Sequence, residues 1–143
     1  MSWSRVKQRL EEFICEPLQG RVQFYITSYR RDRSTSTVDA RDLGRAWVTV
    51  DGNEILSYSG KIVPNEEGLE LSRQEFYELL KAYPDRSLEL SLSSELMLAR
   101  GIAMIDRRLG KRRLGIMKME NEEAFVKTLY LLRCEVEQIS PNL

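Results

Sequence analysis

RAWVTVDGNEILSYSG, residues 45–60, is the stretch of sequence that decides the fold class. Its first half alternates between two sets of residues, with Ala46, Val48 and Val50 on one face and Trp47 and Thr49 on the other. A period of two is typical of a β-strand. Asp51-Gly52 then supplies a tight-turn dipeptide before the chain returns, which is the strongest local signal for a hairpin. We therefore predict two antiparallel strands here.

A third strand is predicted immediately upstream, over residues 21–30 (RVQFYITSYR), because this segment is rich in aromatic and β-branched residues. One face carries Val22, Phe24 and Ile26, and the other carries Tyr25, Thr27 and Tyr29. Exposed, the second face could stack on bases or on a peptide; buried, it would receive a helix. With Trp47 on a neighbouring strand, we expect this face to belong to the core. The polar segment 31–43 is predicted to be a long surface loop.

Helices are predicted on both sides of these strands. Apolar residues at three- and four-residue steps indicate an amphipathic helix over 2–16. Ser72 and Glu75 form a capping-box pattern that opens a helix ending before Pro84. Two more helices are expected over 94–109, followed by Gly110 as its C-terminal cap, and over 121–138. Residues 84–92 alternate leucine with polar residues, so a short fourth strand is possible there.

This element order predicts the α+β class in one domain, residues 1–143. We expect an antiparallel meander of three or four strands with an N-terminal helix and about three further helices packed on one face. The composition agrees, with 42% hydrophobic and 31% charged residues in 143. No run of about 18 apolar residues and no signal-peptide pattern is present, so we expect a cytoplasmic protein without a membrane partner. Cys15 and Cys134 are then expected to be separate buried thiols.

The chain contains no histidine. This excludes Ser-His-Asp and Cys-His nucleophile pairs, HExxH metal sites and acid/base chemistry by imidazole. We expect no cofactor and no metal. Enzymatic activity is disfavoured but stays open in one form, a histidine-free enzyme in which Asp106 and nearby glutamates act as acid and base.

Positive charge is concentrated between residues 100 and 118, which contain seven Lys or Arg and one Asp. Because the whole chain is balanced at 22 and 22, the remainder carries a charge of −6. The densest part is residues 106–113, called the basic segment below. Its candidate binding residues for a ligand or partner are Asp106, Arg107, Arg108, Lys111, Arg112 and Arg113.

Three uses of the basic segment are open. Clustered arginines can bind phosphate or carboxylate groups through bidentate hydrogen bonds. They can also face a protein partner, or be neutralised within the chain. The internal candidates are the glutamates at 66, 67 and 70 or at 120, 122 and 123. A sequence pI near 6.4 argues against a dedicated nucleic-acid binder. The Gly-Lys-Arg triplet lacks the spacing of a phosphate-binding P-loop.

Two residues interrupt the apolar stretch LMLARGIAMI, residues 96–105. We expect the guanidinium of Arg100 to reach water at the edge of its helix, because a buried one would need a carboxylate or several carbonyls. Gly101 costs about 1 kcal/mol relative to alanine in a helix. A neighbouring element is therefore expected to approach the backbone closely at this position.

Several short motifs together resemble a family of small bacterial proteins of unknown function. They are Trp3-Ser4, Gly20-Arg21, Tyr29-Arg30, the Asp106-Arg-Arg-x-Gly-Lys-Arg112 run and Leu132-Arg-Cys-Glu135. The resemblance covers nearly the whole chain and implies a bacterial, cytosolic protein without an assigned catalytic residue. Some members of that family carry a nonribosomal-peptide-synthetase label. It does not fit this chain, whose length and lack of histidine exclude a condensation domain.

The sequence thus favours a non-catalytic protein-interaction or regulatory domain that binds an unidentified protein or itself. The alternative is a phosphate- or nucleic-acid-binding module that uses the basic segment. A histidine-free enzyme is the further alternative.

Overall fold

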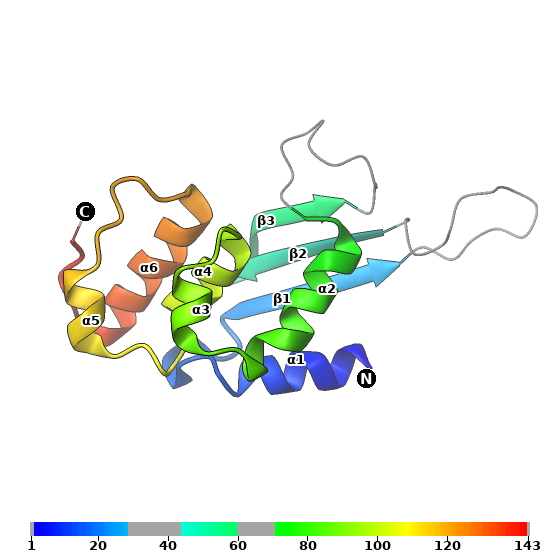
Figure 1. The fold of residues 1–143 in the computed structure, drawn as a ribbon, viewed down its shortest axis with the longest axis horizontal. Helices are drawn as coiled ribbons and strands as arrows, with labels where there is room; N and C mark the ends of the chain where they lie inside the picture. Colours follow the sequence, from blue (N-terminus) through cyan, green and yellow to red (C-terminus); the bar gives the residue numbers. More distant parts are fainter. Residues whose placement is uncertain (1, 29–43, 60–70, 143) are drawn as a thin grey trace, which may run out of the picture.

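The computed structural model describes residues 2–28, 44–59 and 71–142, and it confirms the α+β class. The described strands form one antiparallel sheet in the order β1-β2-β3. Their bounds are Val22–Ser28 for β1, Gly44–Val50 for β2 and Asn53–Ser59 for β3. This is the predicted meander with three strands (Figure 1). The loop predicted at 31–43 lies outside the described residues.

Six α-helices occur in the described part of the chain, together with two short 3₁₀ turns. The helices are α1 (Trp3–Glu11), α2 (Arg73–Ala82), α3 (Leu88–Leu92), α4 (Met97–Met104), α5 (Lys111–Ile116) and α6 (Ala124–Glu137); the turns are η1 (Glu16–Leu18) and η3 (Tyr83–Asp85). Ser2 caps α1, and Ser72 with Glu75 forms the predicted capping box of α2. These caps satisfy the amides that a helix start leaves unpaired.

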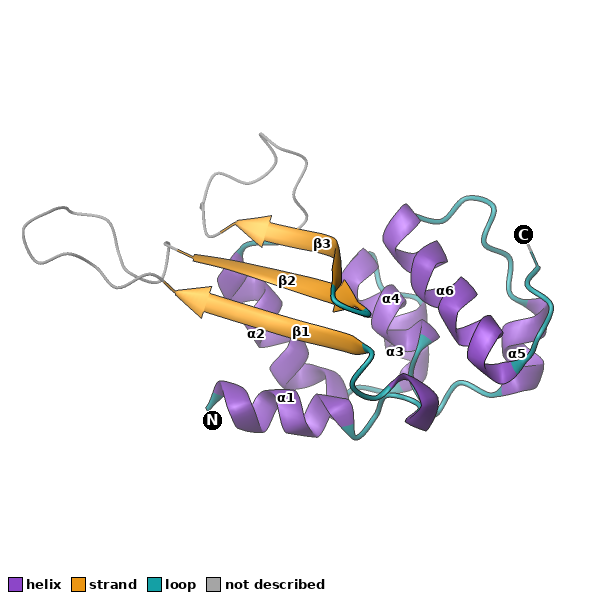
Figure 2. Cartoon of the chain, turned by 180° about the vertical axis from the view of Figure 1, so that it is seen from behind, coloured by secondary structure: helices purple, strands orange, loops and turns teal. Residues whose placement is uncertain are grey.

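The helices divide into two groups. α1 and α2 cover one face of the sheet, whereas α3 to α6 lie together beyond the end of the sheet where β1 begins (Figure 1). Seen from behind, the three strands lie in front of α1 and α2 (Figure 2). No helix of the described residues covers this second face, which is called the open face below.

The hairpin between β2 and β3 turns at Asp51 and Gly52, as predicted. Both residues have positive φ, 51° and 84°, which is the geometry of a type I′ turn that matches the twist of the strands. The register pairs Tyr25 with Trp47 and Trp47 with Ser57. An irregularity between Val48 and Thr49 shifts the pairing with β3 by one residue. Along β2, Ala46 and Val48 are buried and Trp47 between them is only half-buried, as the alternation in the sequence predicts.

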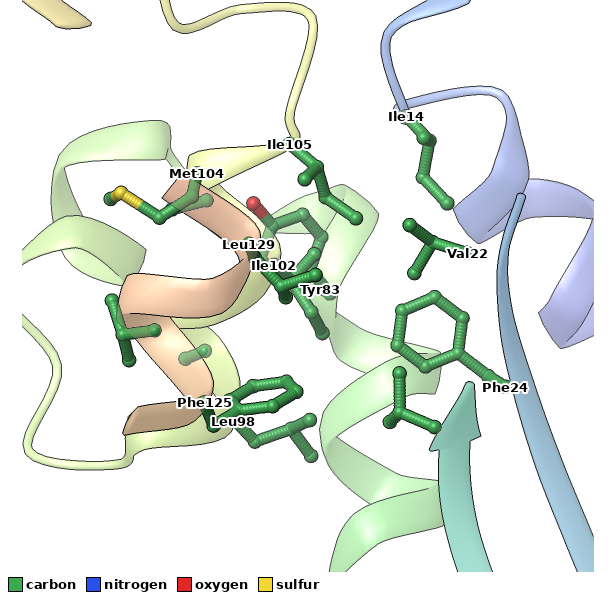
Figure 3. Packing of buried hydrophobic residues seen from close by; sticks show 14 of the residues in the cluster. Ile14, Val22, Phe24, Tyr83, Leu98, Ile102, Met104, Ile105, Phe125 and Leu129 are labelled. Carbon is green, nitrogen blue, oxygen red and sulfur yellow. The ribbon is translucent and has the colours of Figure 1, made fainter. Parts of the chain in front are cut away.

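The core joins the inner face of the sheet to both groups of helices. Val22 and Phe24 of β1 point toward Tyr83 and Ile102, and all four are at most 2% exposed (Figure 3). The predicted close approach at Gly101 is confirmed. A Cβ placed there would lie 2.3 Å from Cε2 of Phe125 on α6, so a side chain at this position would collide with the ring.

Three predictions for the C-terminal half are wrong in type or in bounds. Residues 88–92 form helix α3 instead of a fourth strand, because the Ser87 side chain accepts a hydrogen bond from the Leu90 amide and caps a helix start. The helix predicted over 94–109 ends at Met104, and Gly110 is the N-terminal cap of α5. The last helix, predicted over 121–138, begins at Ala124, with Glu123 at the capping position.

Cys15 and Cys134 are both buried free thiols, as predicted. No helix in the described ranges is long and apolar enough to cross a membrane.

Candidate functional site

The basic segment lies between α4 and α5 and is attached to the connection between α1 and β1. Asp106 forms an isolated β-bridge with Ile14. The amide of Arg107 donates to the Phe13 carbonyl at 2.7 Å, and the amide of Cys15 donates to the Ile105 carbonyl at 2.8 Å. Backbone hydrogen bonds therefore hold the start of the segment against a part of the chain about ninety residues earlier.

Asp106 is the buried centre of this attachment, with 1% of its surface exposed. The hydroxyl of Tyr83 donates to its Oδ2 at 2.6 Å, and Nη2 of Arg108 donates to the same atom at 2.8 Å. Burial, and secondarily the Asp106 charge, raises the pKa of Tyr83 well above its usual range. The hydrogen bond to Asp106 likewise raises the pKa of Arg108. Both partners thus stay protonated: Arg108 forms an ion pair with Asp106, and Tyr83 donates a hydrogen bond to it.

Arg108 is further enclosed by aromatic rings. Its guanidinium carbon lies 4.7 Å from the ring centre of Phe13 and 5.7 Å from that of Tyr83. Nη1 donates to the Arg86 carbonyl at 2.9 Å. Cation–π contacts of this kind add to an ion pair when water is excluded. The guanidinium of Arg108 therefore makes its contacts within the chain.

Arg133 supplies a second internal anchor that the sequence did not suggest. Its guanidinium is 3% exposed and donates to three carbonyls, those of Met104, Asp106 and Leu109, at 3.2, 2.8 and 2.8 Å. A charged donor of this kind satisfies acceptors that the end of α4 leaves unpaired. Next to it, burial raises the pKa of the Cys134 thiol, which opposes the reactive thiolate that a neighbouring arginine would favour.

The other cations of the basic segment fall into two kinds. Lys111 Nζ lies 3.3 Å from Glu137, and Arg113 Nη2 donates to Glu89 at 2.9 Å. Within the described residues, no carboxylate is paired with Arg107 or Arg112, both of which are exposed. Arg107 instead lies 5.4 Å from the Phe13 ring centre. Three of the five candidate cations are therefore neutralised by carboxylates within the chain.

The carboxylates that pair with the basic segment are mostly not those predicted. Glu122, one of the expected residues, pairs with Arg100 at 2.9 Å instead of with the segment. Arg100 also donates to the Ser94 carbonyl at 2.8 Å. The expectation that Arg100 simply reaches water is therefore wrong, because a carboxylate and a carbonyl hold it at the helix edge. The predicted glutamates at 66, 67 and 70 lie outside the described residues.

Two surface hollows are lined by described residues, and neither contains the acid proposed for catalysis, Asp106. One hollow of about 240 Å³ is lined by Lys118, Met119, Glu120 and Asn142. Another, of about 360 Å³, lies along α2 and reaches Arg86 and Leu96. Among the residues that the structure describes, no three His, Cys, Asp or Glu gather as a metal site would require.

The open face of the sheet presents a different arrangement. Tyr25 and Trp47 lie opposite each other on β1 and β2, with ring centres 5.0 Å apart and ring planes inclined by 15°. Both side chains are half-buried and lie outside the core. The prediction that this face belongs to the core is wrong, because α1 and α2 cover the opposite face. Aromatic pairs prefer such offset stacking.

A cation covers each end of this aromatic pair. Lys7 reaches from α1, with Nζ 4.8 Å from the Tyr25 ring centre. The guanidinium carbon of Arg45 lies 4.3 Å from the Trp47 ring centre, and its Nη2 donates to Ser57 of β3 at 3.3 Å. Arg45 is also ion-paired with Glu54 of β3. Since Lys7 comes from beyond β1 and Arg45 leans toward β3, the order across the sheet is cation, ring, ring, cation.

We call these four side chains the aromatic stack. Gln23 connects two of its members, since its Oε1 accepts hydrogen bonds from Lys7 Nζ at 3.4 Å and from the Tyr25 hydroxyl at 3.1 Å. The stack is therefore held in place by Gln23 of β1 and by Ser57 and Glu54 of β3 before any partner binds. The sequence offered one signal for it, the alternation that places Tyr25 and Trp47 on the same face.

Comparison with family models places the chain among related proteins. The model of the SF0329 protein family matches residues 2–70 and 61–134. The chain belongs to the SF0329 protein family. The match to SF0329 includes the aromatic stack and the whole basic segment. Comparisons with curated proteins and with solved structures found no match.

Proposed function

We propose that this SF0329 protein is a non-catalytic interaction domain that binds a protein partner on the open face of its sheet. The observation that carries the proposal is the aromatic stack: a tyrosine and a tryptophan, ordered by two cations, on a sheet face left without a helix by the described residues. The basic segment is secondary in this proposal, because most of its charge is used within the chain.

The composition of the stack supports a protein partner. Tryptophan, tyrosine and arginine are the residues that most often dominate the binding energy of protein interfaces. A side chain that is already held in one conformation loses less entropy when a partner arrives. Trp47 is held by Tyr25 on one side and by Arg45 on the other. The open face therefore has both the residue types and the preorganisation of an interface centre.

The same geometry argues against base stacking. Proteins that bind single-stranded nucleic acids present aromatic rings on which a base can lie flat. Here the outer faces of both rings are covered by cations of the chain itself, Lys7 and Arg45. A base would have to displace one of them. Contacts to the edges of the rings, which a protein side chain can make, need no such displacement.

Affinity capture with the full-length chain tests the proposal. Wild type and Trp47→Ala would be used side by side on lysate of the source organism, and the recovered protein would then be purified and its Kd measured. We expect the substitution to weaken binding about 30-fold or more, as truncation of a central interface residue does. Because Trp47 is outside the core, the free energy of unfolding should change little.

The matched control is Arg107→Glu with Arg112→Glu, which reverses the two exposed cations without paired carboxylates among the described residues. We expect this variant to keep the partner. A partner that is lost by this control and retained by Trp47→Ala would contradict the proposal and move the site to the basic segment.

The phosphate- or nucleic-acid-binding alternative depends on the same two arginines. If only Arg107 and Arg112 contact phosphates, a plot of the logarithm of the affinity against that of the salt concentration should have a slope of about −1.4 on a single strand, roughly −0.7 for each contact. Fluorescence anisotropy with a labelled single-stranded oligonucleotide at low salt measures this. Binding with a slope of about −3.5 would require all five cations, including those now paired with carboxylates.

A further inference from the structure

We infer that the partner element on the open face is a single amphipathic α-helix of another protein, with acidic side chains beside Lys7. The inference rests on the proposed function and narrows it to one kind of occupant. Three observations carry it: the size of the face, the state of its backbone groups and the distribution of its charge.

The face is the size of one helix. Three strands of seven residues, about 4.8 Å apart and rising about 3.3 Å per residue, cover roughly 330 Å². A standard interface between two folded proteins takes about 800 Å² from each partner. The flat area of the face is less than half of this value, so we take its occupant to be one secondary-structure element and not a second copy of the whole chain. A helix about 10 Å wide and about 15 residues long matches its width and length.

The backbone of the face also favours a helix. β2 is paired with a strand on each side, whereas β1 and β3 are edge strands whose groups not paired with β2 point outward within the sheet plane and not out of the open face. A ligand lying flat on the sheet therefore finds side chains there, but no backbone partners. An extended peptide in that position would leave its own amides and carbonyls unpaired, at a cost for each buried group. A helix satisfies its backbone internally and needs only side-chain contacts.

Charge on the face is uneven. Arg45 is ion-paired with Glu54. Lys7 donates to the Gln23 oxygen and lies over the Tyr25 ring, and within the described residues no carboxylate forms an ion pair with it. One end of the stack therefore carries a cation that has no ion pair in the described part of the chain. A helix with glutamate or aspartate at the α1 side would complement it and meet the aromatic edges with its apolar stripe.

A displayed library of helical peptides tests this inference. The library would contain peptides of about 15 residues with apolar residues fixed at i, i+4, i+7 and i+11 and free choice elsewhere. Selection would use the full-length chain, after depletion on Trp47→Ala. We expect the recovered peptides to gain helical circular dichroism on binding and to lose about 30-fold in affinity for Trp47→Ala. They should also be enriched in acidic residues on one side.

Lys7→Glu provides the test of orientation. This variant should weaken the acidic peptides, and exchanging their acidic side for lysine should restore binding. Lys118→Glu, an exposed lysine in the loop between α5 and α6, is the control and should have no effect.

Three results would overturn the inference. These are recovered peptides that bind in an extended form by NMR, Trp47-dependent binding of a single-stranded oligonucleotide, and a Trp47-dependent dimer in sedimentation. The inference also fails, while the proposed function stands, if a Trp47-dependent protein partner is captured but does not compete with the helical peptides. If instead helical peptides bind and no partner depends on Trp47, the proposed function fails.

Discussion

At the scale of single residues, Gly101 is a position where the addition of one methyl group should lower the free energy of unfolding. A Cβ there would lie 2.3 Å from the Phe125 ring, which is buried between α4 and α6. Gly101→Ala should destabilise the protein by about 1–3 kcal/mol, the usual cost of overpacking a core. Urea unfolding followed by circular dichroism measures the change.

Gly115 provides the internal comparison. It lies in α5, and a Cβ there would approach Ile139 only to 3.8 Å, an ordinary contact. Gly115→Ala should therefore stabilise the protein by up to about 1 kcal/mol through the higher helix propensity of alanine. Equal effects at the two positions would contradict the explanation from close packing.

Tyr83 and Asp106 form a buried pair whose energy can be isolated. Tyr83→Phe removes one donor and leaves Arg108 on the carboxylate, so we expect a loss of about 1.5–3 kcal/mol for a hydrogen bond to a charged group. Asp106→Asn also disrupts the ion pair with Arg108 and should cost more. A double-mutant cycle of the two changes, measured by denaturant unfolding, should give a coupling of at least about 0.5 kcal/mol. Simple additivity would contradict a direct bond.

The sequence predicted some of these residues and not others. A glycine in an apolar helix is a local signal, so the close approach at Gly101 could be inferred. The role of Arg133 could not, because its three carbonyl partners lie 24 to 29 residues away. Only the fold decides that these carbonyls meet. The contact between Asp106 and the Tyr83 hydroxyl could not be predicted either, because Tyr83 belongs to η3, 23 residues earlier in the chain.

At the scale of elements, the hairpin turn is tied to the start of β1 by an ion pair. Arg21 donates to both oxygens of Asp51 at 2.9 Å, and this bond holds the pKa of Asp51 below its usual value. A lowered folded-state pKa gives stability that is present above the unfolded-state pKa, near 3.9, and is lost as the pH falls through the folded-state value. The pair should therefore act at neutral pH and fail in acid.

Arg21→Met should raise the pKa of Asp51 toward its ordinary value and reduce the loss of stability below about pH 4. Carboxyl ¹³C chemical shifts in an NMR titration report the pKa directly. Glu89 is the control, since Arg113 holds its pKa low independently. An unchanged Asp51 pKa in Arg21→Met would show that the pair does not form in solution.

Elements with a single dominant signal were predicted better than short ones. The hairpin and α2 follow from Asp51-Gly52 and from the capping box, both of which the structure contains. The alternation of leucine with polar residues at 88–92 fits a strand and a short helix equally well. There the bond from the Leu90 amide to Ser87 marks the helix start, and a five-residue helix leaves little periodicity to read.

At the scale of the whole molecule, the segregation of charge in the sequence is largely compensated in space. Acidic side chains of α3 and α6 reach the basic segment, whose Arg113 and Lys111 they neutralise. A linear window of the sequence shows the excess of +6 but cannot show which distant carboxylates fold back onto it. This is why the sequence favoured the basic segment as a site.

We therefore expect substitutions of arginines with and without a paired carboxylate to differ in their effect on the free energy of unfolding. Arg107→Glu with Arg112→Glu should change the free energy of unfolding by no more than about 0.5 kcal/mol per site, as exposed substitutions do. Arg108→Ala should be far more harmful, by about 3 kcal/mol or more, because it leaves Asp106 buried with its charge uncompensated. Thermal and urea unfolding of the two variants give the comparison. Equal losses would mean that the pairs are not formed.

The placement of the two tryptophans has a spectroscopic consequence. Trp3 belongs to α1 and lies near Tyr77, whereas Trp47 lies in the aromatic stack. In a Trp3→Phe variant, all remaining indole emission would originate from the open face. A partner that binds to that face would change the polarity around Trp47 and shift its emission maximum. The molecule therefore carries its own optical reporter at the surface where we place its function, and titrations need no attached dye.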